Sequence, residues 1–479
     1  MITFLVALAM LVGGYLIYGL LVERIVGADP KRPMPCDTLR DDIDFMPMPT
    51  WKVFLIQFLN IAGMGPIFGA IMGIMFGPAA FLWIVLGTIF AGGVHDFLSG
   101  VLSARSGGIS MPEMVGNELG KVVRQLVRPV SLVMLVLVGA VFVLTPASLL
   151  AKLTPAWMGT EFWIITIFIY YILATLLPID KVIGRFYPIF GASLLFMAIG
   201  ILCVLTFGDV TIPDGITSGF YNRNPKSDSY PIFPMMFVSI ACGAISGFHS
   251  TQSPMMARCL KNEKLARPVF YGAMVTEGIV ALIWAAAAIA FTGGYDGLSD
   301  YMATHDGPAD LVSDISWGWF GLVGGILAIA GVIAAPITSG DTALRSARLI
   351  IADIMKLDQS KIWKRILVSL PIFIVTYVVM KTDFEVLWRY FAWTNQTLSV
   401  FMLWAGAAYL ARNGRFYLIA MIPAMFMTCV CTTYILFAPE GFELDRNTSL
   451  LCGVATALLF GGLFLRKFVW QRRIEPAEL

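Results

Sequence analysis

The chain has 479 residues, of which 58% are hydrophobic and only 13% are charged, and its mean hydropathy is +0.80. Soluble globular proteins carry about 25% charged residues, so this composition excludes a soluble chain and indicates an integral protein of the lipid bilayer. The net charge of +2 comes without any basic stripe, so we expect no nucleic-acid partner. The fold class that follows is an all-α polytopic membrane protein.

A helix needs about 20 apolar residues to cross a bilayer, and 13 stretches of the chain approach this length. The expected spans are roughly 2–22, 53–76, 79–103, 130–150, 161–178, 183–207, 232–257, 268–292, 317–340, 364–380, 384–411, 415–437 and 450–470. The first span lacks a basic segment before it and a clear small-residue cleavage site. We therefore expect a retained helix rather than a signal peptide.

Lysine and arginine are distributed unequally between the connectors, and this sets the expected orientation. With the N-terminus outside, 27 of the 33 Lys and Arg residues fall on the inner side and 6 on the outer side. Cytoplasmic loops are enriched in these residues, and the outer connector 295–316 is instead acidic. We expect a multi-pass protein of the plasma (inner) membrane with its N-terminus outside and its C-terminus in the cytoplasm.

Two of the expected spans contain clusters of helix-breaking residues. The second span carries NIAGMGPIFG (60–69), and the seventh carries FVSIACGAISGFHSTQSPMM (237–256). The two lie five spans apart, which is an odd number, so two five-helix units that each open with a broken helix have opposite topologies. Inverted repeats with discontinuous helices are the architecture of many secondary transporters.

This symmetry predicts the organisation of the whole chain. Residues 1–52 form an N-terminal helix and a cytoplasmic loop, and 53–207 form the first five-helix repeat. The second, inverted repeat occupies 232–411, and two C-terminal helices occupy 412–479. Sequence identity between the halves is negligible, so the prediction depends on the break positions and the topology.

The two breaks form the expected substrate site. Backbone polar groups inside a bilayer need partners, and proline clashes with the carbonyl four residues earlier, so Pro66 and Pro254 each free one carbonyl group. Freed carbonyls suit a cation, and half-helix N-termini suit a carboxylate; the alternative is that Gly and Pro only permit kinks or close packing. The expected substrate-binding residues here are Gly63, Met64, Gly65, Pro66, Ser246, Gly247, Phe248, His249, Ser250, Thr251 and Gln252.

Three of the expected site residues have polar side chains for which more than one role is possible. His249 could meet a substrate carboxylate or carry a proton, because imidazole changes charge near physiological pH; a packing role is the alternative. Asn395 and Gln396 lie about eleven residues into their span, near midmembrane depth at about 1.5 Å per residue. We expect them to contact substrate, with hydrogen bonding between helices as the alternative.

Acidic residues inside the expected spans are candidates for coupling to an ion. Charges inside a membrane are costly and usually face a cavity or a partner, and Asp96, Glu277 and Asp341 are of this kind. Thr338 and Ser339 precede Asp341 and could offer hydroxyl groups to a small cation. Pairing of Asp341 with an arginine one turn later is the alternative. We expect the coupling ion to be H⁺ or Na⁺.

The seven cysteines show no metal-binding pattern in the sequence. Most lie in apolar stretches, and none belongs to a CxxC motif or to a Cys/His cluster at metal spacing. There is also no GxxxxGK[ST] motif, no HExxH motif and no paired axial histidine for haem. We expect no metal site and no cofactor besides a coupling ion.

Four stretches resemble the carbon starvation protein A family, which is described as peptide and pyruvate uptake permeases. They are IAGMGPIFG (61–69), AGGVHDFLS (91–99), IACGAISGFHSTQSP (240–254) and LWRYFAWTNQTLS (387–399), with a weaker fifth at ITSGDTALRSAR (337–348). The resemblance runs from about residue 1 to residue 470. It implies the LeuT-like five-plus-five fold of the amino acid–polyamine–organocation superfamily, and uptake of pyruvate, related monocarboxylates or short peptides.

The chain departs from this family in two respects. Family members carry a histidine just before the phenylalanine that precedes the first break, whereas here Gln57 precedes Phe58. If that histidine serves proton coupling, the resemblance does not carry this coupling over. The chain is also shorter than the long enterobacterial members, so the choice of substrate need not carry over either.

These observations predict a secondary-active transporter that takes up small organic solutes by alternating access. An ion channel with ohmic flux is the alternative from another class. A membrane enzyme finds no support, because no nucleophile and base lie at a credible spacing. The sequence leaves open the substrate, the coupling ion and the oligomeric state.

Overall fold

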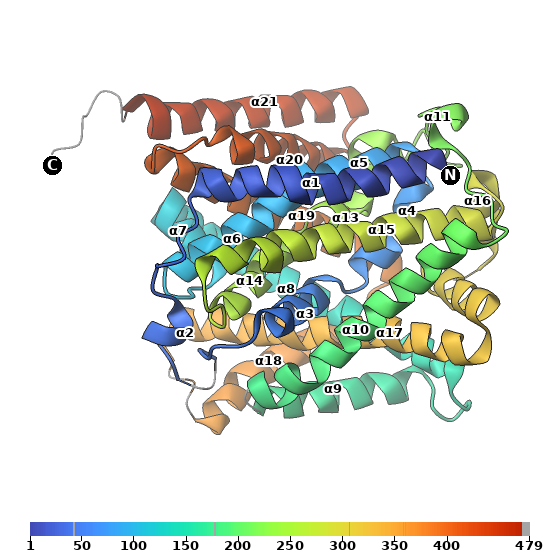
Figure 1. Ribbon diagram of the computed structural model, residues 1–479, viewed down its shortest axis with the longest axis horizontal. Helices are drawn as coiled ribbons and strands as arrows, with labels where there is room; N and C mark the ends of the chain where they lie inside the picture. Colours follow the sequence, from blue (N-terminus) through green and yellow to red (C-terminus); the bar gives the residue numbers. More distant parts are fainter. Residues whose placement is uncertain (42–43, 177–178, 306, 358, 360, 472–479) are drawn as a thin grey trace.

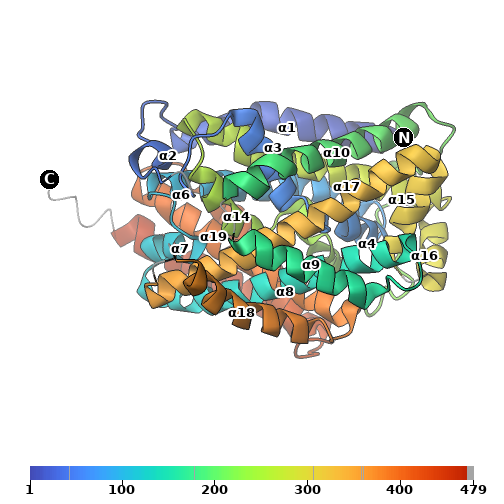
Figure 2. The same ribbon diagram turned by 90° about the horizontal axis from the view of Figure 1, so that it is seen from below.

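A computed structural model of the chain describes residues 1–41, 44–176, 179–305, 307–357, 359 and 361–471. All regular structure in these residues is helical, and the long helices lie roughly along one axis (Figure 1, Figure 2). This confirms the all-α prediction. The end of the predicted span 161–178 and the last eight residues of the C-terminal segment lie outside the described residues.

The helices follow the order of the predicted spans. α1 (Ile2–Val26) and α2 (Pro35–Thr38) precede the first repeat. The predicted first repeat contains α3 (Thr50–Ile61), a π-helical turn (Gly65–Gly69), α4 (Ala70–Ile74), α5 (Ala79–Gly87), a π-helical turn (Thr88–Gly92), α6 (Gly93–Arg105), α7 (Met111–Leu119), α8 (Lys121–Leu153), α9 (Thr160–Leu176) and α10 (Ile179–Phe207).

The second half has the same general layout. α11 (Gly215–Ser218) leads into it. It contains a π-helical turn (Ile232–Met236), α12 (Phe237–Ser239), α13 (Ala241–Ala244), α14 (Gly247–Ala257), a 3₁₀ turn (Glu263–Leu265), a π-helical turn (Arg267–Tyr271), α15 (Gly272–Phe291), α16 (Tyr295–Thr304), α17 (Pro308–Met355), α18 (Ile362–Val379) and α19 (Phe384–Arg412). The chain continues through α20 (Leu418–Phe437), α21 (Arg446–Phe464) and a final π-helical turn (Leu465–Trp470).

Each of the 13 predicted spans contains helix, and the spans 53–76 and 232–257 are interrupted at residues 62–64 and 245–246. By length and apolar composition alone, eight of the described helices could cross a membrane, or nine if a bent pair counts as one span. The count of 13 spans therefore stays a prediction. Large apolar side chains cover the outer surface, for example Ile17 and Leu322 with 76% and 70% of their area exposed, as expected for helices that face lipid.

The first predicted break is confirmed. α3 ends at Ile61, Ala62 leaves the helical conformation with φ −79° and ψ 55°, and the chain resumes at Gly65 with its axis bent by 56°. Pro66 lies at the start of the second piece, where a missing backbone N–H leaves no helical hydrogen bond unmade. Met64 therefore lies in the short connection between the two pieces.

The second break is confirmed too, although one of its predicted causes is wrong. α13 ends at Ala244, Ile245 and Ser246 are extended, and α14 begins at Gly247. Pro254 lies inside α14 and does not end it, since proline lacks one N–H donor and so removes only one hydrogen bond from the helix. Ser250, Thr251 and Gln252 consequently lie on a helix and not on unwound chain.

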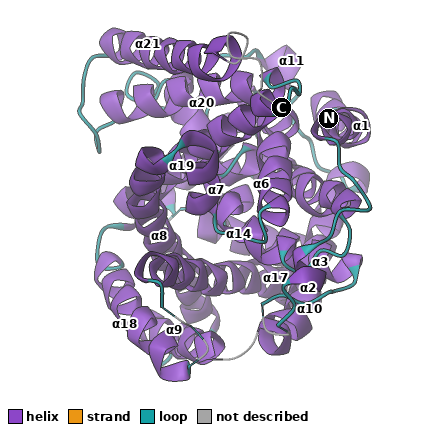
Figure 3. Cartoon of the chain, turned by 90° about the vertical axis from the view of Figure 1, so that its left-hand side faces the viewer, coloured by secondary structure: helices purple, strands orange, loops and turns teal. Residues whose placement is uncertain are grey.

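The two breaks meet inside the bundle. α14 contacts α3, α6, α17 and α19, and Figure 3 shows it in the interior when the molecule is viewed along its long axis. A Cβ atom on Gly65 would lie only 2.4 Å from the sulfur of Cys242. Glycine at position 65 therefore allows the first break to pack directly against the second.

The connectors separate to the two ends of the bundle as the charge distribution predicts. The N-terminus, α11 and α16, all expected outside, lie at one end, and α2 and α7, both expected inside, lie at the other (Figure 1). The structure contains no membrane, so which end faces the cytoplasm stays a prediction.

One buried carboxylate fastens the predicted inner end. Glu263 is fully buried, and it accepts hydrogen bonds from Arg105 Nε at 2.6 Å and Nη2 at 3.1 Å and from the backbone N–H of Asp29 at 2.6 Å. Arg105 also donates to Tyr409 Oη. The segment after α1, the end of α6 and α19 are thereby joined at one point.

Removal of this carboxylate is expected to destabilise the fold. Breaking a buried ion pair leaves the partner charge unpaired and costs about 3–5 kcal/mol, so Glu263→Ala should clearly lower the unfolding temperature of the purified protein. Glu161→Ala is the matched control, because the Glu161–Lys381 pair is more than half exposed and solvent screens such pairs, so that they contribute little to stability. Equal unfolding temperatures for the two variants would contradict this role of Glu263.

Candidate functional site

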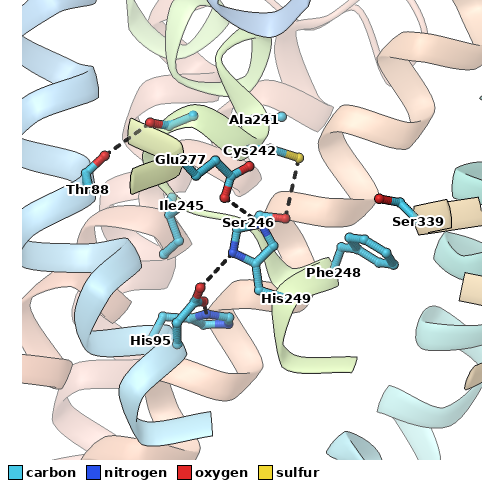
Figure 4. A network of polar contacts seen from close by, with 12 residues as sticks. Thr88, His95, Ala241, Cys242, Ile245, Ser246, Phe248, His249, Glu277 and Ser339 are labelled. Atoms are coloured by element: carbon cyan, nitrogen blue, oxygen red, sulfur yellow. Dashed lines mark hydrogen bonds and ion pairs between the residues drawn. The ribbon is translucent and has the colours of Figure 1, made fainter. Parts of the chain in front are cut away.

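A chain of four buried ionisable side chains lies at the second break (Figure 4). His249 stands between two carboxylates, with Nδ1 at 2.8 Å from Asp96 Oδ2 and Nε2 at 3.2 Å from Glu277 Oε2. His95 Nδ1 contacts the other oxygen of Asp96 at 2.7 Å. Three of these residues were predicted candidates, and the structure brings them together with the neglected His95.

Three helices position this cluster. His249 lies in the first turn of α14, immediately after the break, Asp96 lies in the first turn of α6, and Glu277 lies in α15. All the side chains are fully buried, where a charge is stable only when it is paired and hydrogen-bonded, so each residue of the cluster depends on its neighbours.

Side chains from α19 and from the turn before α6 satisfy the backbone of the second break. Gln396 Nε2 donates to the carbonyls of Ala241 at 2.7 Å and Ile245 at 3.0 Å. Asn395 Oδ1 accepts from the backbone N–H of Phe248 at 2.7 Å and from Ser246 Oγ at 3.0 Å. Asn395 and Gln396 thus make the hydrogen bonds between helices that the sequence left as an alternative, and their contact with substrate stays a prediction.

Thr88 completes this set, although it was not among the residues predicted from the sequence. Its hydroxyl donates to the carbonyl of Gly243 at 3.1 Å. Three carbonyls of the second break, those of Ala241, Gly243 and Ile245, therefore accept hydrogen bonds from protein side chains, as backbone in a low-dielectric interior requires. A threonine three residues before the stretch AGGVHDFLS was the available signal.

The hydroxyl groups after the break are engaged within their own helix. Ser250 Oγ donates to the carbonyl of Gly247 at 2.6 Å, and Thr251 Oγ1 donates to that of Phe248 at 2.7 Å. Gln252 Nε2 donates to Thr251 Oγ1 at 2.8 Å. Their predicted role in substrate binding is not tested by these contacts.

The first break is linked to α17 by a predicted coupling residue. Ser339 Oγ donates to the carbonyl of Leu59 at 3.0 Å, and a Cβ atom on Gly63 would lie 3.3 Å from that hydroxyl and 2.6 Å from the Phe142 ring. Thr338 Oγ1 donates instead to the carbonyls of Ala334 and Ala335. Thus Ser339 reaches the break, and Thr338 bonds within α17.

Asp341 is the predicted acid that the structure places apart from the histidine cluster. It lies on α17 and is buried, and Arg345, one turn later, donates Nη2 to the carbonyl of Ala174 at 2.7 Å. The role of Asp341 in coupling therefore stays a prediction.

Two buried amide side chains beside the first break are candidates for contact with an external ligand. Gln57 and Asn60 of α3 are fully buried, and none of their four side-chain polar atoms has a hydrogen-bond partner in the described part of the chain. Buried amides without partners are rare because each costs about 1–3 kcal/mol. In the sequence Gln57 stands out only as a departure from a family pattern, and neither Gln57 nor Asn60 was predicted to contact substrate.

The comparison with curated proteins supplies relatives with and without named substrates. A Haemophilus influenzae protein named uncharacterized membrane protein is 42% identical over 348 residues, which cover 63% of this chain and 94% of the relative. The pyruvate/proton symporter BtsT of Escherichia coli is 26% identical over 359 residues (62% of this chain, 49% of BtsT), and the peptide transporter CstA of Campylobacter jejuni is 26% identical over 334 residues (56% and 47%). The chain thus spans about half the length of these two transporters.

Solved transporter structures share the fold at low sequence identity. A Na⁺-coupled sialic acid symporter aligns with a TM-score of 0.52 at 14% identity over 98% of each chain. The manganese transporter of Eremococcus coleocola aligns with a TM-score of 0.53 at 12% identity over 91% of this chain and 99% of that one. These likenesses confirm the LeuT-like helical fold and say nothing of the cargo.

The family model described as carbon starvation protein CstA matches residues 1–170 and 154–317. Together these ranges span about two thirds of the chain and contain both breaks and all four residues of the histidine–carboxylate cluster. The chain belongs to the carbon starvation protein CstA family.

Proposed function

We propose that this protein is a secondary-active, proton-coupled importer of small organic solutes that works by alternating access. The observation that carries the proposal is the position of His249 between Asp96 and Glu277, directly after the second break. An imidazole in contact with two buried carboxylates can gain or lose a proton without the cost of creating an isolated charge.

The cluster can couple proton binding to a movement of the break. His249 belongs to α14, and its carboxylate partners belong to α6 and α15. Protonation changes the attraction between these helices, because a neutral imidazole interacts with the two carboxylates far more weakly than an imidazolium does. In this proposal His249 carries the proton and does not bind the substrate.

We propose pyruvate, a related monocarboxylate or a short peptide as the substrate. The named relatives BtsT and CstA support these two classes. Gln57 and Asn60 are offered as substrate contacts in addition to the predicted residues of the breaks, because their amide groups lack partners in the described structure. Amides can donate to a carboxylate and accept from a peptide N–H, so they suit either class.

Labelled pyruvate and a labelled dipeptide, tested in proteoliposomes, separate the possible activities. We expect saturable counterflow of at least one of them, and accumulation driven by an inward proton gradient without Na⁺. Accumulation driven by Na⁺ alone would contradict the role of the histidine cluster. Ohmic, non-saturating flux would indicate an ion channel and would contradict the transporter itself.

A further inference from the structure

The buried cluster contains another ionisable group, which the proton chain does not use. Cys242 of α13 is 1% exposed, and it lies beside His249 and Glu277 at the break (Figure 4). Its sulfur, a ring nitrogen of His249 and a carboxylate oxygen of Glu277 all lie within 4.8 Å of one another. The fold therefore gathers three different metal-ligating atoms that are 7 and 28 residues apart in sequence.

We propose that Cys242, His249 and Glu277 form a binding site for a divalent transition-metal ion of the zinc class. Zinc accepts sulfur, nitrogen and oxygen ligands, whereas Na⁺, Mg²⁺ and Ca²⁺ sites are built from oxygen alone. Ligands held tetrahedrally at about 2.0–2.3 Å from zinc stand roughly 3.5 Å apart. A contraction of about 1 Å closes the site and leaves a fourth position open.

The orientation of His249 agrees with this assignment. Histidines that bind a metal through one nitrogen generally donate the other N–H to a carboxylate, which fixes the ring. Here Nδ1 lies at 2.8 Å from Asp96 Oδ2, and Nε2 faces Glu277 at 3.2 Å. Asp96 is itself held by His95, so the ring is presented to the proposed site by two further residues.

An independent observation also indicates a cation. Glu277 Oε1 is buried without a hydrogen-bond partner among the described residues, and Glu277 Oε2 and His249 Nε2 have only their mutual ion pair at 3.2 Å. Buried polar atoms in this state are costly. A metal ion between them would satisfy the ring nitrogen and a carboxylate oxygen at once.

Metal binding at this site exchanges two positive charges for two protons. The Cys242 thiol and the His249 imidazolium each release one proton, and the freed sulfur and nitrogen lone pairs bond to the metal. The other ionisable groups that face the site are Glu277 from α15 and Asp96 and His95 from α6. We infer that bound zinc blocks proton-coupled transport by taking the place of the proton on His249; this consequence rests on the proposed function, and metal binding itself does not.

Cobalt spectroscopy on the purified full-length protein tests the site directly. We expect Co²⁺ to produce a thiolate-to-metal charge-transfer absorption that one equivalent of Zn²⁺ abolishes. Cys242→Ser should remove this absorption and weaken Zn²⁺ binding by at least about tenfold. Cys431→Ser is the matched control, because Cys431 is also buried but lies on α20, and it should leave both measurements unchanged.

Two outcomes would overturn the proposal. One is that the wild-type protein shows no Co²⁺–thiolate absorption and binds no Zn²⁺ in equilibrium dialysis. The other is that the absorption survives in Cys242→Ser, which would place the metal on other cysteines. If Cys242→Ser fails to fold, Cys242→Ala replaces it in the same two measurements.

Transport assays separate this inference from the proposed function. We expect Zn²⁺ to inhibit proton-driven uptake by the wild type, and the ratio of uptake with and without Zn²⁺ to return close to one in Cys242→Ser. Uptake by the wild type that Zn²⁺ does not affect would contradict the blocking role. A wild type that binds Zn²⁺ but transports neither substrate would count against the proposed function and leave the metal site standing.

Discussion

His249→Ala is expected to abolish the accumulation of substrate against its gradient. The substitution removes the group between Asp96 and Glu277, and breaking a buried ion pair from one side costs about 3–5 kcal/mol. Both carboxylates can then lower their energy by taking up protons permanently, so the site no longer cycles. We expect proton-driven uptake in proteoliposomes to fall by about 100-fold, which corresponds to about 3 kcal/mol.

Counterflow distinguishes a variant that has lost proton coupling from one that has lost its fold. If His249 carries the proton and does not bind substrate, exchange of labelled for unlabelled substrate should persist in His249→Ala while accumulation disappears. His305→Ala is the matched control, because His305 is the only histidine outside the cluster in the sequence and is exposed; it should accumulate substrate normally. Accumulation by His249→Ala at the rate of the wild type would falsify the coupling role.

Gly247→Ala is expected to disrupt the second break. A Cβ atom at this position would lie 2.3 Å from the backbone oxygen of Asn395 and 2.5 Å from the backbone nitrogen of Ser399. These are main-chain atoms of α19 and cannot turn aside as a flexible side chain can. Overpacking of this kind costs about 1–3 kcal/mol, and here it also pushes α19 away from the hydrogen bonds that Asn395 and Gln396 make to the break.

The expected result is a lower unfolding temperature together with loss of both counterflow and accumulation. Gly13→Ala tests the same change where a Cβ atom would meet nothing within 4 Å. That position lies inside α1, where alanine is favoured over glycine by about 0.5–1 kcal/mol, so this variant should be at least as stable as the wild type. Wild-type unfolding and transport in Gly247→Ala would show that α19 does not need this close approach.

The fold could be predicted well from the sequence because the bilayer constrains the length and polarity of each span. Apolar stretches of about 20 residues give spans, and Gly and Pro within them gave both breaks near Gly63 and Gly247. Pro254 was misjudged because proline can end a helix or lie inside one. Only the hydrogen-bond partners of the surrounding backbone decide between these two outcomes.

The site was predictable as a set of residues but not as an arrangement. Asp96 and His249 are 153 residues apart, and no periodicity shows which side chains of two different spans will touch. Cys242 gave no metal-binding signal, because its neighbours in sequence are apolar and the other residues of the proposed metal site lie in other turns or helices. Asn395 and Gln396 were predicted from their polarity. That their side chains face the second break became visible only from the packing of α19 in the structure.

The hydrogen bonds from α19 to the second break make the conformation of that break a property of two helices. A helix holds its own shape through bonds within one segment, whereas Ala241–Phe248 is held largely by Asn395 and Gln396. Any rotation of α19 therefore changes the angle between α13 and α14 and, with it, the distance of His249 from its carboxylates. The conformation of the break thus depends on a neighbouring helix, and in the proposed function mutations on α19 should alter the proton affinity of His249.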